Sequence, residues 1–455
     1  MPTPAFSPFS EALDRISIDD LAALRDLSEG WYVEYKSELT SQKAIAKAIS
    51  AFANTYGGWI FYGISEDSGG QRIAGEYCGI PVSDAPAAET RIRQAVSAHM
   101  NPPAFFRSRV LIGPSSELDL PKDRAIIAIE VALSLDAPHV HSDGRIYRRV
   151  ADESDPRPET DRHFLDLLWT RRRDARKSVE DRLREEPSLS KAEENDTYFD
   201  IFITPDVYGE FGASDTLNFD EFVELMRDDA SHSVAIPFDN FFTNPWGYVA
   251  RQISKNEDQA LVTTWQQDFT GECHVTFPLS SADLSKPEII SDFLSAYDAG
   301  SDFVNLLTSY NVQGGMLIDL SQLFAALCGI FHRYSSIRQR IGIRYPIYAK
   351  SRLYNMWRRV PFLDMSEYIE FVREHRLPFV QESVIYAPTG VTPESFQRID
   401  RSSDNDLSEA AKDYTNAGVT LGLIAQATGI PFQRIIDAED MISRLLDMSQ
   451  RQQQN

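Results

Sequence analysis

A strand, a helix and a second strand follow one another between residues 31 and 65, and this unit constrains the fold more than any other part of the chain. The helix, SQKAIAKAISAFANT, begins after an N-cap at Ser41, shows apolar residues at helical spacing and ends before Gly57-Gly58. The strand after it, WIFYGIS, is short, aromatic and β-branched, which is typical of a buried strand. Because strands joined through one helix are usually neighbours in a sheet, we expect the two strands to lie side by side.

The first strand of this unit, WYVEYKSEL, is unusual because charged residues alternate with its apolar ones. Side chains two positions apart lie on the same face of a strand, so Glu34 and Lys36 share a face. Glu29 comes just before this strand, and Glu66 follows the second strand with Asp67 beside it. If the two strands are neighbours, the three glutamates converge.

Three carboxylates within about 5 Å of one another repel by roughly 1–4 kcal/mol per pair at a protein surface. Such a cluster therefore needs a bound cation, a basic partner or extra protons. Oxygen ligands of this kind suit a hard divalent ion such as Mg²⁺ or Mn²⁺. The alternative is that the charges only form the solvated outer face of a half-buried strand.

The order of elements along the chain predicts an α+β fold with two domains. Helices and strands mix over residues 1–183, which we interpret as an N-terminal mixed α/β domain. The charged stretch REEPSLSKAEENDT, residues 184–197, is predicted to be a linker, or else a surface loop inside one larger domain. Residues 198–448 are predicted to form a second mixed α/β, largely helical domain, and residues 449–455 a disordered tail.

The composition limits the partners and the compartment of the protein. A formal net charge of −23 over 455 residues argues against an open surface that grips nucleic acid, so a binding groove would have to be local. The three cysteines are far apart and favour neither a disulfide framework nor a zinc ribbon, so we expect a cytoplasmic protein. No apolar stretch reaches the roughly 18 residues that would span a bilayer, so no membrane association is expected.

One long segment has the opposite charge. Residues 320–363 contain eight Lys and Arg and no Asp or Glu, with tyrosines and a tryptophan between them. Arginine binds phosphate and aromatic rings stack on unpaired bases, so this segment could line a groove for RNA. The alternative is that its arginines pair with the surplus acids of the chain. The arginines singled out are Arg338, Arg340 and Arg344 here, and Arg171, Arg172 and Arg173 in the helix FLDLLWTRRRDARKS.

Three segments, VEYKSEL, AISAFANTYGGWIFYGISEDSGG and GRIYRRVADES, together resemble the Schlafen Alba-type (AlbA_2) domain family over roughly residues 15 to 175. The resemblance implies a metal-dependent endoribonuclease that cuts transfer RNA or related RNA. Its metal ligands would be Glu29, Glu34 and Glu66, with Asp67 adjacent to the third, and Lys36 would stabilise the phosphate oxygens. The segment YRRV matches the family's arginine-bearing strand, so Arg148 and Arg149 are expected at the nucleic acid.

The resemblance also implies partners for the enzyme. Relatives with two fused copies of the domain form a groove around RNA, and a homodimer of this chain could supply the second half. The C-terminal domain would then act as a sensor of a trigger or as a specificity domain, and defence against phage is the implied biology in a bacterium. The competing hypothesis is a regulator that binds nucleic acid or nucleotide through the same domain without cutting it.

Overall fold

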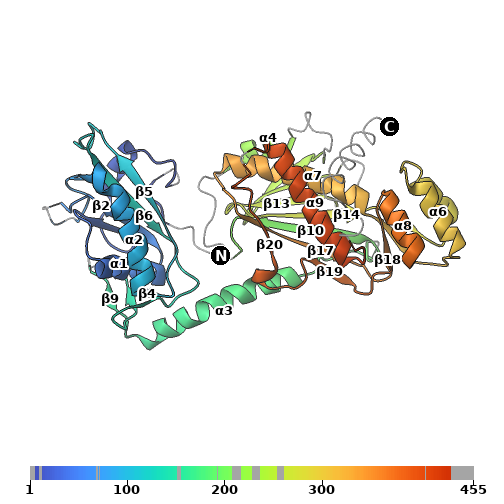
Figure 1. Cartoon of the computed structure of the whole chain (residues 1–455), viewed down its shortest axis with the longest axis horizontal. Helices are drawn as coiled ribbons and strands as arrows, with labels where there is room; N and C mark the ends of the chain where they lie inside the picture. The colour runs from blue at the N-terminus through green and yellow to red at the C-terminus, as the bar shows by residue number, and fades with distance from the viewer. Residues whose placement is uncertain are drawn as a thin grey trace. The chain divides into compact units, whose positions relative to one another are not determined.

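This computed structural model describes residues 6–9, 13–67, 70, 72–150, 155–191, 193–207, 217–227, 236–253, 261–404 and 406–431. The chain divides into two compact units, the first formed by Met1–Asp181 with Tyr208–Asp215 and the second by Arg182–Val207 with Thr216–Asn455. Both units mix helices and strands, so the predicted α+β class is confirmed (Figure 1). The tail predicted over residues 449–455 lies outside the described residues.

The first unit is built on a five-stranded sheet. Its strands are β1 (Val33–Lys36), β2 (Gly58–Tyr62), β3 (Ile80–Pro81), β5 (Phe106–Ile112) and β6 (Arg124–Val131). Strand β1 runs parallel to β2, as the strand–helix–strand unit predicts, whereas β2 and β5 both pair antiparallel with β6. Among the described strands β1 pairs with β2 alone, so the charged strand lies at an edge of the sheet.

Two helices, α1 (Gln42–Asn54) and α2 (Ala85–His99), cover one face of this sheet (Figure 1). The apolar stripe of α1, including Ile49 and Phe52, packs with Ile60 and Ile127 in one buried cluster. The side chain of Ser41 caps α1 by accepting a hydrogen bond from the Ala44 amide (3.3 Å), as the sequence predicts. On the other face the 3-10 helix η1 (Asp19–Asp26) contributes leucines to a second cluster that contains aromatic residues of β2.

The turn between α1 and β2 requires glycine. Gly57 has a φ of +72°, and a Cβ atom there would lie 2.7 Å from backbone atoms of Val131 and Leu133. The turn therefore passes too close to the end of β6 for any side chain, and it brings β2 back into the sheet directly after the helix.

Short strands complete the first unit and lie near the carboxyl end of α1. They are β4 (Met100–Asn101) with β7 (Val140–His141), and β8 (Tyr147–Arg148) with β9 (Arg157–Pro158); η2 (Val82–Asp84) precedes α2. The Asn54 side chain donates hydrogen bonds to the backbone carbonyls of His139 (3.1 Å) and Tyr147 (3.0 Å). The last residues of α1 thus fix the segment that carries the two candidate arginines.

The second unit is built on an eight-stranded sheet with strand order β11-β12-β13-β14-β10-β17-β19, in which β20 also pairs with β17. All its neighbouring strands are antiparallel. A three-stranded sheet, β15-β16-β18, lies in the same unit. The strands are β10 (Thr197–Thr204), β11 (Asn240–Asn244), β12 (Gly247–Arg251), β13 (Thr264–Asp268), β14 (Cys273–Leu279), β15 (Ser281–Asp283), β16 (Met316–Asp319), β17 (Ile347–Tyr354), β18 (Arg359–Phe362), β19 (Val384–Ala387) and β20 (Gln397–Ile399).

Two long helices of this unit, α7 (Leu320–Arg340) and α9 (Glu409–Ala427), pack against each other and cross the large sheet (Figure 1). The side chain of Asp319 caps α7 by accepting from the amides of Ser321 and Gln322. The other elements are α4 (Phe219–Arg227), α5 (Pro287–Phe293), α6 (Gly300–Ser309), α8 (Ser366–His375) and the 3-10 helix η3 (Pro393–Ser395).

The last residues of helix α3 (Arg162–Arg184) belong to the second unit, where the arginine of a buried ion pair binds them. Arg352 donates to Asp200 Oδ2 from Nε (3.0 Å) and Nη2 (2.8 Å), and from Nη1 to the carbonyl of Leu183 (2.6 Å). Burial opposes ionisation, but His274 and Arg352 hold the pKa of Asp200 well below its ordinary value. The stretch 184–197, predicted as a linker, is likewise tied to this unit, because Tyr354 donates to the carbonyl of Glu185 (3.2 Å).

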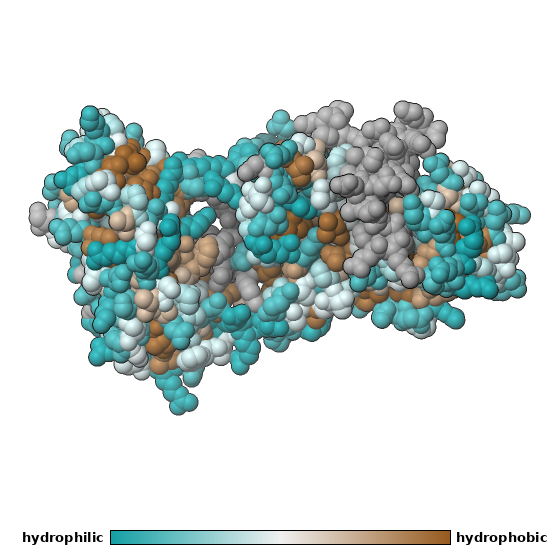
Figure 2. Space-filling model, in the orientation of Figure 1, coloured by the Kyte–Doolittle hydropathy of each residue, from teal (hydrophilic) through white to brown (hydrophobic). Residues whose placement is uncertain are grey.

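On the side shown in Figure 2, hydrophilic residues predominate among the described residues and hydrophobic ones form separate groups. In the described part of the chain no helix combines the length and the apolar character needed to cross a bilayer.

Candidate functional site

The charged residues of β1 and its flanks converge at the free edge of the first sheet. The Lys36 ammonium lies 3.2 Å from Glu34 Oε1 and 3.8 Å from Glu29 Oε1. Glu66 follows β2 and forms an isolated antiparallel bridge with Ala74, and its carboxyl is close enough to raise the pKa of Glu29. The structure thus brings Glu29, Glu34, Lys36 and Glu66 together; we refer to these four residues as the carboxyl cluster.

The Glu29 side chain lies in the cluster because it accepts a hydrogen bond from the outer edge of β1. The Trp59 and Gly63 amides donate to the carbonyls of Tyr32 and Lys36, respectively. The backbone N–H and C=O groups of the even-numbered residues of β1 therefore point toward β2. The Tyr35 amide consequently points away from the sheet, and Glu29 Oε1 accepts its hydrogen bond (3.1 Å). An unpaired amide at a sheet edge would be costly once buried, so Glu29 stabilises the strand as well as contributing charge.

The environment of Glu29 favours its protonated form. Its side chain is completely buried, and burial raises its pKa from 4.5 to about 8. Lys36 opposes this shift, while Glu66 and Glu34 add to it. The second oxygen, Oε2, is buried and has no hydrogen-bond partner among the described residues. At neutral pH the cluster therefore reduces its repulsion by holding a proton on Glu29.

Lys36 and Glu66 are the members of the cluster that reach solvent. The Lys36 side chain is 27% exposed, against 3% for Glu34, and Glu66 lies on the surface. Burial alone would lower the pKa of Lys36, but Glu34 and Glu29 outweigh this effect and raise it, so the ammonium stays charged. Asp67 is half-buried beside Glu66, and its backbone amide donates to the carbonyl of Ile73 (2.9 Å).

Arg149 lies inside the domain rather than on a surface. Its side chain is fully buried, and Nη1 donates to Glu34 Oε2 (2.7 Å). With Lys36 at the other oxygen, both oxygens of the Glu34 carboxylate face a cation. Our expectation that Arg149 contacts nucleic acid therefore does not fit its position, since a polynucleotide has no access to it.

The three carboxylates do not form a ready-made metal site. In the ranges that the structure describes, no group of three or more His, Cys, Asp and Glu side chains is arranged to hold a metal ion. Glu34 is committed to Arg149 and Lys36, so it does not fit a divalent cation as it stands. Glu29 and Glu66 fit a divalent cation once Glu29 gives up its proton, because Glu29 Oε2 has no hydrogen-bond partner among the described residues and the two carboxyls are neighbours. The metal set Glu29, Glu34 and Glu66 stays a prediction.

The arginines of helix α3 and of β8 make contacts within the first unit. Arg148 pairs with Glu159 (2.7 Å), and Arg171 donates to the carbonyls of Ser134 (3.0 Å) and Asn54 (3.2 Å). Arg172 pairs with Asp136, and Arg173 lies 3.3 Å from Asp174. Arg173 is about three-quarters exposed and is the most accessible of these four.

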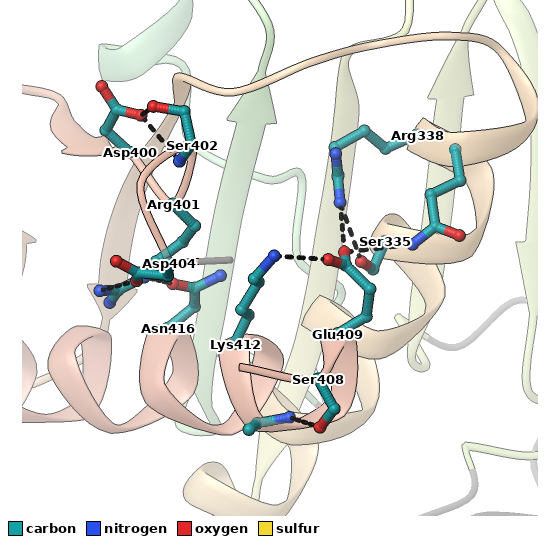
Figure 3. A network of polar contacts seen from close by, with 12 residues as sticks. Ser335, Arg338, Asp400, Arg401, Ser402, Asp404, Ser408, Glu409, Lys412 and Asn416 are labelled. Carbon is teal, nitrogen blue, oxygen red and sulfur yellow. Dashed lines mark hydrogen bonds and ion pairs between the residues drawn. The ribbon is translucent and has the colours of Figure 1, made fainter. Parts of the chain in front are cut away.

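The acid-free segment is largely engaged inside the second unit. Arg338 is buried at the α7–α9 contact, where it donates to Glu409 Oε2 (2.7 Å), and Lys412 lies 2.8 Å from the other oxygen of Glu409. Figure 3 shows Glu409 pointing between these two cations, from the first turn of α9. Arg340 pairs with Glu221 of α4, whereas Arg344 is exposed. Arg338 and Arg340 therefore pair with acids of the same chain, which is the alternative to an RNA groove that the sequence left open.

The first unit is a mixed α/β domain with an acidic cluster at an edge of its sheet. A comparison with protein families adds to this description. The model of the family described as Schlafen, AlbA_2 matches residues 29–158, so this part of the chain is similar to the Schlafen AlbA_2 domains. That family has nucleic-acid-related functions and is broadly associated with nucleases. The match contains the whole carboxyl cluster, and the second unit lies outside it.

Comparison with individual proteins adds little. The crystal structure of the DIP2311 protein from Corynebacterium diphtheriae is similar at 18% sequence identity with a TM-score of 0.20. The similar region covers 31% of this chain and 28% of that chain, so less than a third of either is involved. No curated protein matches the sequence.

Proposed function

We propose that the first unit is a metal-dependent endoribonuclease that cuts transfer RNA or a related structured RNA at the carboxyl cluster. The observation that carries the proposal is the convergence of three glutamates on one lysine, with Lys36 and Glu66 open to solvent. In this arrangement the Lys36 ammonium is available to the non-bridging oxygens of a phosphodiester, and the carboxylates behind it keep it charged.

The remaining residues of the cluster have distinct roles in this proposal. Glu66 is the exposed carboxylate of the cluster and lies on the side open to the substrate. Glu29, with its pKa raised by burial to about 8, would release its proton when a metal ion binds. Mg²⁺ or Mn²⁺, held by Glu29 and Glu66, would supply positive charge opposite the phosphate.

The test is incubation of the purified full chain with total transfer RNA, with Mn²⁺ or with EDTA. We expect cleavage with Mn²⁺ only, and a loss of roughly 10²–10³-fold in rate in Lys36→Met, which removes the phosphate-facing charge. Glu66→Gln should lower the rate in the same way, and Glu38→Gln is its matched control because Glu38 is exposed and follows the same strand. Undiminished cleavage by Glu66→Gln would remove that residue from the mechanism.

The second candidate is a module that binds nucleic acid without cutting it. One observation favours it: both oxygens of Glu34 are paired with cations and the Glu29 side chain is fully enclosed, as in a structural ion-pair network. The same assay decides between the two, since a binding module would retain RNA on a filter and leave it intact with every metal tested.

The other parts of the protein have proposed roles that depend on this function. The second unit would act as a sensor or specificity domain, and a homodimer would provide the second half of an RNA groove. A strictly monomeric mass in solution, with and without RNA, would argue against the dimer.

A further inference from the structure

Arg149 joins several parts of the backbone around the carboxyl cluster. Its Nε and Nη2 donate to the carbonyl of Gly30 (3.0 and 2.7 Å), and Nη2 also approaches the carbonyl of Val33 (3.5 Å). Its Nη1 donates to Glu34 Oε2 (2.7 Å), and its guanidinium lies 4.8 Å from the ring centroid of Phe52. One side chain thus joins the turn before β1, the strand itself and helix α1.

These contacts fix the spacing between the first two glutamates of the cluster. Glu29 and Glu34 flank a tight turn that the Gly30 amide closes by donating to the carbonyl of Val33 (3.0 Å). Arg149 binds the carbonyls at both ends of that turn as well as the Glu34 carboxylate. If the turn moves, Glu29 can no longer reach the Tyr35 amide on the edge of β1.

Arg149 is itself held by the end of α1. Its backbone amide donates to Thr55 Oγ1 (2.9 Å), and the Asn54 side chain holds the carbonyl of Tyr147 two residues earlier (3.0 Å). Asn54, the last residue of α1, and Thr55, its C-cap, are both buried. Thr55 also caps α1 by donating to the carbonyl of Ala51 (2.7 Å), and Asn54 also accepts from the His139 amide (2.8 Å). The end of α1 therefore fixes the backbone on both sides of the arginine.

We propose that Arg149 is a positioning residue of the carboxyl cluster: it locks the turn between Glu29 and Glu34 so that both carboxyls face Lys36. The proposal rests on the proposed function only for its catalytic consequence. An arginine is needed because its planar fork can bind a carbonyl and a carboxylate at once, whereas a lysine offers a single point of charge. Arg149→Lys keeps the positive charge but loses the planar set of donors, so it tests the role of the charge and the role of the donor geometry separately.

The experiment measures site-resolved hydrogen exchange in the full chain, for Arg149→Lys and for a matched control, Arg148→Lys. In Arg149→Lys we expect the Gly30 and Tyr35 amides to exchange at least tenfold faster, while the amides of β2, such as that of Ile60, keep their wild-type rates. Uniform acceleration of all amides would indicate loss of stability alone and would overturn the proposal, as would unchanged protection of Tyr35. Arg148→Lys should change none of these amides, because Arg148 pairs with Glu159 instead.

A second variant covers the case in which Arg149→Lys does not fold. Thr55→Val keeps the shape of the side chain but removes the acceptor of the Arg149 amide, together with the hydroxyl's own hydrogen bond to the Ala51 carbonyl. It should give the same selective acceleration of the Gly30 and Tyr35 amides to a smaller extent. Activity is measured separately: Arg149→Lys should lower kcat for RNA at least tenfold with KM changed less than twofold. If the wild type cuts no RNA, the proposed function fails while the exchange pattern still decides the role of Arg149.

Discussion

Replacement of Glu29 by glutamine should change how the stability of the first unit depends on pH. Glu29 has an ordinary pKa of 4.5 when unfolded and a pKa of about 8 in the fold. Below pH 4.5 both states hold the proton, so the group costs nothing. Between these values only the unfolded state ionises, and the free energy of unfolding falls as the pH rises through this window. Glutamine cannot ionise and can still accept from the Tyr35 amide, so the variant lacks this loss.

The magnitude follows from the size of the pKa shift. Each pKa unit corresponds to about 1.4 kcal/mol, so between pH 5 and pH 9 the wild type should lose on the order of 4 kcal/mol relative to Glu29→Gln. For a unit of this size that amounts to roughly 8–16 °C in Tm. Scanning calorimetry in EDTA at pH 5, 7 and 9 measures the difference, with Glu38→Gln as the control that should follow the wild type. A constant difference in Tm between wild type and Glu29→Gln across this range would refute the assignment of a buried, protonated Glu29.

Three further predictions concern the scaffold. Asp200→Asn should destabilise the second unit by about 3–5 kcal/mol in urea unfolding, because it leaves a buried guanidinium uncompensated; the exposed Asp292→Asn should have no measurable effect, and equal effects would contradict this reasoning. Gly57→Ala should cost roughly 1–3 kcal/mol more than Gly144→Ala, since both have positive φ but only Gly57 lies against backbone atoms; equal Tm values would count against the close approach. Arg338, Arg340 and Arg344 are the subject of the third prediction. When all three are replaced by glutamine, the slope of RNA affinity against salt concentration should stay unchanged, and a flatter slope would show that they contact phosphates.

The local elements of the first unit could be predicted from the sequence because their signals are local. Ser41, the apolar stripe of α1 and Gly57 specify where the helix begins and ends, and the structure confirms them. The parallel pairing of β1 with β2 follows from the same unit. Strand alternation placed Glu34 and Lys36 on one face, and the neighbouring strands brought Glu29 and Glu66, which flank them, to the same place.

The partners of the arginines could not be predicted in this way. Arg149 meets Glu34 across 115 positions of sequence, and Arg352 meets Asp200 across 152. A run of basic residues shows how much charge a segment holds, but the fold decides which acid faces each one. Net charge therefore said little about which arginines remain exposed. The polar pair Asn54 and Thr55 was the one local signal for Arg149, since buried polar residues at a helix end need partners.

The hydrogen bond from the Tyr35 amide to Glu29 has a consequence for reading relatives of this domain. A carboxyl group at this position maintains the architecture of an exposed strand even where no reaction takes place. A descendant that had lost its activity would still be under selection to keep the residue, whereas Glu66 would be free to drift. If the carboxyl cluster is catalytic as proposed, the exposed acid, rather than the enclosed one, is the better marker for sorting active from inactive members by sequence.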